Sequence, residues 1–169
     1  MNLLTTVIRR EAMELEGEFM RVREVMTKTP VCCTSVDSLQ TAADLMKSHD
    51  VGAIPVVNNF TERKLLGIVT DRDICIKAVA AGKINGMIKV MDVMTKSPIT
   101  CRPDDSIEAC ESKMERNQVR RIPVIDAQGV CIGIVAQADI ALRDIAEHTS
   151  HTVAAISRHR APVPATAHA

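Results

Sequence analysis

The sequence predicts an α+β fold in which two copies of a βαββα unit pack sheet to sheet with pseudo-twofold symmetry. The main observation is internal repetition: 14 of the 36 positions from Val22 to Val57 carry the same residue 68 positions later, against about two expected by chance at average residue frequencies. After a two-residue shortening, Gly67-Ile68-Val69 recurs as Gly133-Ile134-Val135. A unit of this size covers only one face of its sheet, so we expect the two copies to pack against each other.

Each unit is expected to begin with a short strand and a helix. The run Val31–Thr34 is mainly apolar and follows Pro30, which suits the start of a strand. Asp37 and Gln40 have the spacing of a helix N-cap and the third helical residue, and Asp105 begins the same spacing in the second copy. In the first copy apolar residues then recur at i, i+3, i+4 and i+7, as Leu39, Ala42, Ala43 and Met46. We therefore expect helices to start at these two aspartates.

The rest of each unit is predicted to be a hairpin and a second helix. In the first copy the apolar runs 53–57 and 65–69 are joined by a polar turn, which favours antiparallel pairing. The second helix is expected to run from Arg72 to Ala81 and to end at Gly82, a residue type common just after helices. Its counterpart should begin near Gln137. These elements divide the chain into an N-terminal extension (1–19), a first repeat (20–82), a linker (83–88), a second repeat (89–147) and a C-terminal tail (148–169).

Composition excludes several classes of function. The 21 basic and 21 acidic residues cancel, so there is no net field to attract nucleic acid or an anionic membrane. The aromatic residues are Phe19 and Phe60 alone, too few to form a stacking platform for single strands. No apolar run approaches the length of a membrane span, and Arg9 and Arg10 follow the first apolar stretch, unlike in a secretory signal. The six cysteines lack C-x-x-C spacing and are expected to be buried reduced thiols in a cytoplasmic protein.

Three strings recur in the same order in both halves, and together they resemble the CBS domain, named after cystathionine β-synthase. In the first half they are Val25-Met26-Thr27-Lys28-x-Pro30, then Ile54-Pro55-Val56-Val57, then Gly67-Ile68-Val69, which continues as Thr70-Asp71-Arg72-Asp73-Ile74. The resemblance covers residues 20–143. It implies a Bateman module, a pair of repeats with two clefts that often dimerises. In similar proteins the clefts bind AMP, ADP, ATP, S-adenosylmethionine or NAD and regulate an attached or partner protein.

The resemblance also implies which residues hold the ligand. In the family motif G-h-h-[ST]-x-x-D, the hydroxyl and the carboxylate hold ribose and phosphate, and Thr70 and Asp73 match it. A carboxylate accepts hydrogen bonds from ribose hydroxyls, and a helix N-terminus favours phosphate. Thr-x-x-Asp is also a helix-capping pattern. The second copy keeps Asp139 but has Ala136 in place of the hydroxyl residue, which favours the ligand role of the acid and predicts two unequal clefts.

The copies differ before the Ile-Pro-Val string, where the first has Gly52-Ala53 and the second Arg120-Arg121. In similar modules basic residues there reach the phosphates, and small residues of the opposite repeat border the base. One predicted cleft combines Asp139, Arg120 and Arg121 with Thr27, Pro30, Cys32, Gly52 and Ala53; the other combines Thr70, Arg72 and Asp73 with Thr95, Pro98 and Thr100.

We expect a stand-alone regulatory protein that binds an adenine nucleotide and is not an enzyme. The sequence has no G-x-x-x-x-G-K-[ST] loop, no G-x-G-x-x-G fingerprint and no nucleophile motif. No resident cofactor or metal is expected, and His148 and His151 are interpreted as part of an exposed helix rather than as metal ligands. The expected partners are a second copy of the chain and an unidentified regulated protein. The alternative is a ligand-independent scaffold for oligomerisation and docking, in which the acids only cap helices.

Overall fold

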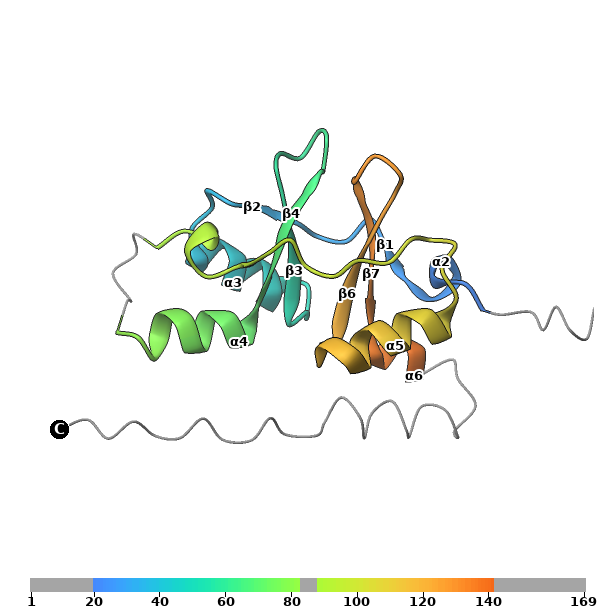
Figure 1. The fold of residues 1–169 in the computed structure, drawn as a ribbon. Helices are drawn as coiled ribbons and strands as arrows, with labels where there is room; N and C mark the ends of the chain where they lie inside the picture. The colour runs from blue at the N-terminus through green and yellow to red at the C-terminus, as the bar shows by residue number, and fades with distance from the viewer. Residues whose placement is uncertain (1–19, 83–87, 142–169) are drawn as a thin grey trace, which may run out of the picture.

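The computed structural model describes residues 20–82 and 88–141. Two small sheets lie side by side, and helices pack against each of them (Figure 1). The first half contains α2 (Val22–Val25), β1 (Thr27–Lys28), β2 (Cys33–Thr34), α3 (Leu39–Ser48), β3 (Ala53–Val57), β4 (Leu65–Thr70), α4 (Asp71–Ile74) and the π-helical turn η1 (Cys75–Val79). The second half contains the 3-10 turn η2 (Val90–Asp92), β5 (Thr95–Lys96), α5 (Ile107–Asn117), β6 (Arg121–Ile125), β7 (Cys131–Ala136) and α6 (Gln137–Ala141).

The predicted hairpins are confirmed. Strands β3 and β4 pair antiparallel from Ala53 opposite Thr70, and the register shifts between Val56 and Val57. Strands β6 and β7 pair in the same way, with the corresponding shift between Val124 and Ile125. Every residue of β3 is buried, because this strand lies between two others in its sheet and is covered on both faces. The same backbone irregularity in both copies supports the pseudo-twofold relation between them.

The two repeats exchange the short strands β1 and β5, an exchange that was not predicted from the sequence. Strand β1 pairs with β7 of the second repeat, and β5 pairs with β4 of the first. The sheets therefore have the orders β2-β3-β4-β5 and β1-β7-β6. Glycine in each Gly-Ile-Val string makes the exchange possible: a Cβ at Gly67 would lie 2.8 Å from the carbonyl oxygen of Thr95, and one at Gly133 would collide with Met26.

The exchange extends into the two cores. Val22 and Val25 of α2 are buried in the core of the second repeat, together with Met114 of α5. Val90 and Val93, at the start of the second repeat, are buried in the core of the first. A third small cluster lies between the repeats and consists of Cys32, Val57 and Cys131, with Leu65 packed against it. The two halves are therefore joined through their cores as well as through their strands.

The first helix of each repeat starts one residue later than predicted. Its N-cap is Ser38 in α3 and Ser106 in α5, where each hydroxyl accepts the backbone N–H three residues on. Asp37 instead accepts the N–H of Thr34 at 2.7 Å and closes the preceding turn, and Asp105 does the same for Arg102. The expectation that the aspartates are N-caps was therefore wrong, because an adjacent serine competes for the same role.

The second helix of the first repeat follows the prediction more closely. It comprises α4 and η1, ends near Val79, and is followed by Gly82 with a φ of +68°, a left-handed conformation that favours glycine. Helix α6 begins at Gln137, as expected. Within the described residues no helix is long and apolar enough to cross a membrane. The predicted N-terminal extension, most of the linker, and the C-terminal tail with His148 and His151 lie outside the described residues.

Candidate functional site

A cleft of about 730 Å³ lies between the two repeats. One wall is the segment between β1 and β2, and a second is the chain that enters β3. The second repeat contributes the start of β6, the end of β7 and α6. The lining residues are Thr27, Thr29, Pro30, Val31, Cys32, His49, Asp50, Val51, Gly52, Ala53, Phe60, Arg63, Arg121, Ile134, Ala136 and Asp139.

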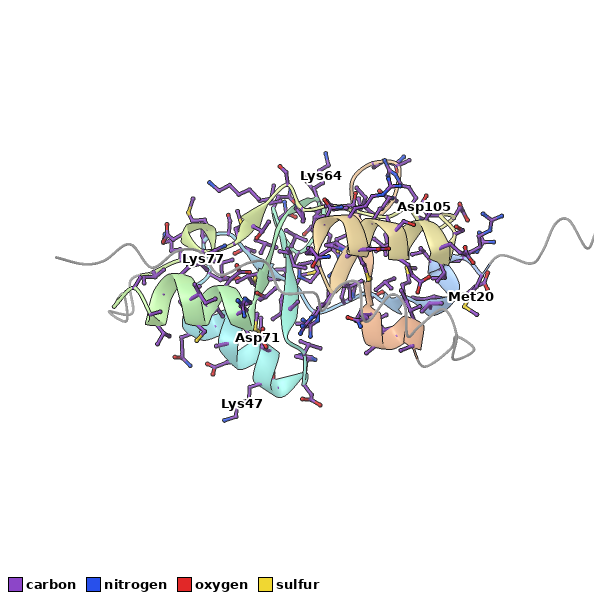
Figure 2. The ribbon with its side chains drawn as sticks, turned by 60° about the horizontal axis from the view of Figure 1, so that its bottom comes forward. Met20, Lys47, Lys64, Asp71, Lys77 and Asp105 are labelled. Atoms are coloured by element: carbon purple, nitrogen blue, oxygen red, sulfur yellow. The ribbon has the colours of Figure 1, made fainter. Side chains whose placement is uncertain are left out.

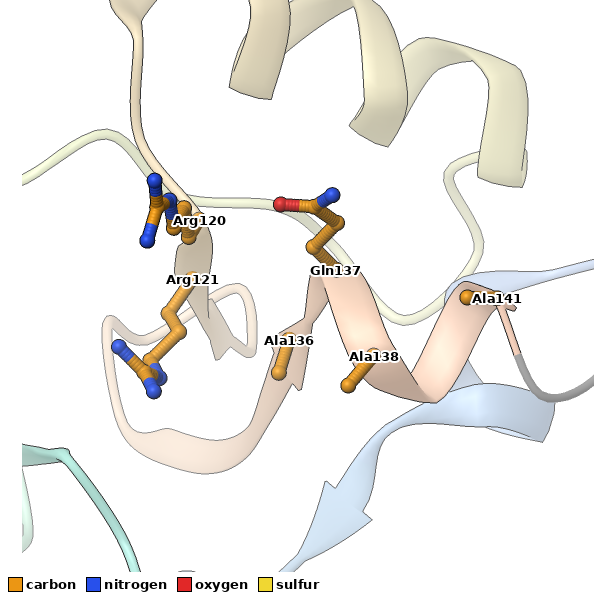
Figure 3. A pocket seen from close by; sticks show the side chains of 6 residues that line it. All are labelled: Arg120, Arg121, Ala136, Gln137, Ala138 and Ala141. Atoms are coloured by element: carbon orange, nitrogen blue, oxygen red, sulfur yellow. The ribbon is translucent and has the colours of Figure 1, made fainter. Parts of the chain in front are cut away.

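Most of the residues predicted for the Asp139 cleft line this one cavity. They are Asp139, Arg121, Thr27, Pro30, Cys32, Gly52 and Ala53. Arg120 does not line it; it borders an adjoining pocket of about 200 Å³ that shares Arg121 and Ala136 with the cleft. Figure 3 shows the two arginine side chains pointing away from each other, as neighbours at the start of a strand do. Arg120 therefore lies beside the cleft rather than in its wall, and its role in binding stays a prediction.

Several residues of the cleft were not predicted from the sequence, above all those from the β3–β4 hairpin. Phe60 and Arg63 belong to the turn between these strands, which is two residues longer than its counterpart in the second repeat. Phe60 is 62% exposed, although the turn around it is held by Asn59, whose side chain accepts the N–H groups of Thr61 and Glu62. The unequal turn length was the signal in the sequence.

Gly52 lies where charged groups of both repeats converge. A Cβ at this position would lie 2.9 Å from a carboxylate oxygen of Asp71 and 3.0 Å from a guanidinium nitrogen of Arg121. Asp71 begins α4 of the first repeat, at the end of the helix nearest the second repeat (Figure 2). Glycine therefore lets the Arg121 side chain lie across the edge of the cleft.

The two motif aspartates have different surroundings. Asp73 accepts both the N–H and the hydroxyl of Thr70, at 3.1 and 2.7 Å, and its other oxygen pairs with Lys77 at 2.7 Å. Within the described residues, Asp139 accepts only the backbone N–H of Ala136, at 2.8 Å. Both acids therefore supply the carboxylate half of a capping box, which does not need the hydroxyl. The reasoning that Ala136 argues against a capping role for Asp139 was wrong.

The residues predicted for the second cleft are spread over several elements. Thr70 and Asp73 form the complete capping box of α4, and Arg72 is exposed in the first turn of that helix. Thr95 lies opposite Ile68 in the exchanged strand pair. The carbonyl oxygen of Thr100 accepts a hydrogen bond from Lys113, and Pro98 is half-buried. Neither of the two cavities described above is lined by any of these six residues.

Comparison with known proteins decides the family. The CBS domain family profile matches residues 22–79 and 90–145. The chain belongs to the CBS domain family. It is 36% identical over 129 residues to the CBS domain-containing protein YhcV of Bacillus subtilis, covering 76% of this chain and 89% of that one. It is 36% identical over 126 residues to hypoxic response protein 1 of Mycobacterium tuberculosis, covering 75% of this chain and 85% of that one.

Solved CBS domain pairs have the same fold. The pair of protein MJ0100, in complex with 5'-methylthioadenosine and S-adenosyl-L-methionine, superposes with a TM-score of 0.66 at 29% identity, over 73% of this chain and 94% of that one. CBSX2 in complex with AMP superposes with a TM-score of 0.62 at 25% identity, over 72% and 93% of the two chains. The α+β fold of two CBS repeats is thereby confirmed.

The thiols of this CBS pair are mostly buried, as predicted. Five of the six are buried, and Cys75 is exposed. Burial, with the charge of Asp37 nearby, raises the pKa of Cys33 to about 12. Cys32 differs because it lines the cleft and accepts a hydrogen bond from the Arg63 guanidinium at 3.2 Å. Among the described residues no group of three or more His, Cys, Asp or Glu side chains is arranged to hold a metal ion.

Proposed function

We propose that this CBS pair is a regulatory sensor that binds an adenine nucleotide in the cleft between Asp139 and Gly52-Ala53. The observation that carries the proposal is the convergence of seven predicted site residues on one cavity. Its volume of about 730 Å³ is in the range of small-molecule sites. Two solved CBS pairs of similar fold contain adenine compounds, which supports this ligand class.

Asp139 is proposed to hold the ribose. Its capping bond to Ala136 uses one carboxylate oxygen, and the other is available, within the described residues, to accept ribose hydroxyls. Ala136 has no hydroxyl, so the Asp139 carboxylate lacks the second capping bond that Asp73 accepts from Thr70. The proposed site thus uses the copy of the motif that departs from the family pattern.

The arginines are proposed to bind phosphate. Arg121 lies over Gly52 at the edge of the cleft, and a guanidinium matches the geometry of phosphate oxygens. Arg120 borders the adjoining pocket, which shares Arg121 with the cleft. A longer phosphate chain would extend from Arg121 toward Arg120. AMP would therefore depend on Arg121, whereas ATP would depend on both arginines.

The cleft at Asp73 is proposed to bind more weakly. A nucleotide there must compete with Thr70 and Lys77 for the same carboxylate. It must also fit beside Arg120 and Arg121. These residues occupy the positions of the second repeat that correspond to Gly52 and Ala53 in the first. The predicted roles of Arg72, Thr95, Pro98 and Thr100 apply to this second site.

One observation favours the scaffold alternative: both motif acids cap helices without a ligand. Titration calorimetry with AMP, ATP, NAD and S-adenosylmethionine separates the two functions. We expect one dominant site, and Asp139→Ala should weaken it by roughly ten- to a hundredfold, the value of one or two hydrogen bonds to a charged group. Asp73→Ala is the matched control and should leave that site unchanged. No heat with any ligand at millimolar concentration would support the scaffold.

The sensor is proposed to act in the cytoplasm on a separate protein, as a homodimer and without catalysis. Ile76 and Val79 on η1 are each 50% exposed, and an apolar helix face of this kind suits a second copy. A related CBS-CP12 protein is described as hexameric. Light scattering tests the assembly, and a mass near 18.4 kDa would contradict the dimer.

A further inference from the structure

Two cysteines from different repeats meet between the sheets. Cys32 lies between β1 and β2 of the first repeat, and Cys131 begins β7 of the second. They share one buried cluster with Val57 and are 5% and 1% exposed. The Cys32 thiol donates to the carbonyl oxygen of Pro30 at 3.3 Å, the Cys131 thiol donates to that of Gly133 at 3.7 Å, and the two thiols lie close enough to shift each other's pKa. A covalent bond between them would therefore join the two repeats directly at the wall of the cleft.

Arg63 fixes the positions of both cysteines. Its guanidinium donates to the Cys32 sulfur at 3.2 Å and to the carbonyl oxygen of Pro30 at 2.9 Å. Its backbone carbonyl accepts the N–H of Cys131 at 2.8 Å. One residue of the β3–β4 hairpin thus holds the backbone of one cysteine and the side chain of the other, with a positive charge beside the thiol that lines the cleft.

The surroundings give the two thiols different chemical roles. The hydrogen bond from Cys131 and the charge of Arg63 lower the pKa of Cys32, although burial opposes them. The interaction with Cys32, together with burial, raises the pKa of Cys131. Cys32 also lines the cleft, so a small oxidant that enters the cleft meets its sulfur first. Cys32 is accordingly the reacting thiolate and Cys131 the resolving thiol.

We propose that Cys32 and Cys131 form a reversible disulfide across the two repeats when a hydroperoxide enters the cleft. The Cys32 thiolate attacks the peroxide oxygen, the O–O bond breaks, and after protonation the products are a sulfenic acid and water or an alcohol. Cys131 then attacks the sulfenic sulfur, the S–O bond breaks, and the oxygen leaves as a second water with the Cys131 proton. The peroxide is reduced by two electrons, which the two thiols supply. The reaction requires only that a hydroperoxide enter the cleft, and so it does not rest on the proposed nucleotide site.

The experiment uses the full chain carrying Cys75→Ser, because the exposed Cys75 would otherwise link two chains. After treatment with hydrogen peroxide and blocking of free thiols, mass spectrometry should show a loss of two blockable thiols that dithiothreitol reverses. Peptide mapping should join Cys131 to Cys32, and Cys33→Ser should retain the link. Absence of the link, or its assignment to Cys33, would overturn the proposal.

The buried pair Cys101 and Cys110 is an internal control. These thiols also shift each other's pKa and lie in one buried cluster, but both belong to the second repeat, and neither lines the cleft. The pKa of Cys101 is lowered as that of Cys32 is, so the two pairs differ in access to the cleft. The Cys32–Cys131 link should therefore form at least roughly tenfold faster than a Cys101–Cys110 link, because oxidation follows access. Cys131→Ala should abolish the fast, reversible loss of blockable thiols, whereas Cys110→Ala should retain it. Equal rates for the two pairs, or persistence in Cys131→Ala, would show the proposal to be wrong.

Discussion

The Asp139 carboxylate accepts the backbone N–H of Ala136 at 2.8 Å, without a hydroxyl to complete the cap. At the matching place in the first repeat, the hydroxyl of Thr70 both accepts from the N–H of Asp73 and donates to its carboxylate. One repeat therefore has a complete capping box and the other has half of one. This difference is the basis for proposing unequal sites, and it can be tested by its effect on stability.

Restoring the missing hydroxyl should stabilise the protein. Ala136→Thr supplies an N-cap oxygen for α6 and should raise the free energy of unfolding by about 0.5–1 kcal/mol. Thr70→Ala removes the corresponding hydroxyl from α4 and should lower it by a similar amount. Urea unfolding followed by circular dichroism measures both. A loss of stability in Ala136→Thr would show that α6 does not use this position as its cap.

Gly52→Ala should weaken ligand binding without destabilising the fold. The new Cβ meets the ends of the Asp71 and Arg121 side chains, which can move, so the stability should change by less than about 0.5 kcal/mol. Displacing Arg121 should lower AMP affinity roughly tenfold. Gly67→Ala is the matched control: its Cβ meets the backbone oxygen of Thr95 and should cost about 1–3 kcal/mol. Unchanged affinity in Gly52→Ala would argue against Arg121 as a ligand residue.

Phe60 should contribute to base binding. It lines the cleft on a turn held by Asn59, and stacking of a base on an aromatic ring is worth about 1–3 kcal/mol. Phe60→Leu should therefore lower AMP affinity by about five- to a hundredfold. Val36→Ala is a control, because Val36 is equally exposed, at 62%, and does not line the cleft. Equal affinity in Phe60→Leu and the parent protein would remove Phe60 from the site.

The ion pair between Asp105 and Lys113 should make stability depend on pH. Partial burial opposes ionisation, but the hydrogen bond from Lys113, at 2.8 Å, lowers the pKa of Asp105 below its ordinary 3.8. The carboxylate therefore contributes stability that is fully present above pH 3.8 and is lost as the pH falls through the lowered value. Lys113→Met should cost about 0.5–1 kcal/mol at pH 7, and this difference should shrink in acid.

Urea unfolding of both proteins between neutral and acid pH measures this effect. Lys47→Met serves as the control, because Lys47 is exposed and lies far from Asp105 (Figure 2). Its unfolding free energy should follow that of the parent protein at every pH. A difference for Lys113→Met that stays constant down to pH 2 would contradict a lowered pKa for Asp105.

The sequence alone was sufficient for the local structure and for the family. Alternation of apolar runs and polar turns predicted the β3–β4 and β6–β7 hairpins, because these contacts are close in sequence. The pattern of apolar and polar residues does not decide whether Asp37 or Ser38 is the N-cap. Both residue types cap helices equally well, and only the backbone path decides which of them reaches the N–H of Thr41.

Tertiary structure alone decided the strand exchange and the composition of the cleft. The Met-Thr-Lys strings of the two repeats are identical, so local preference cannot assign β1 to β7 or to β4. The pairing of β1 with β7 depends on packing between the repeats: Met26 packs against Gly133, and Val22 is buried in the core of the second repeat. The same long-range packing brings Phe60 and Arg63 into one cleft with Cys32 and places Arg120 in the adjoining pocket. A repeated sequence determines what each half forms, whereas the contacts between the halves arise only when both are packed together.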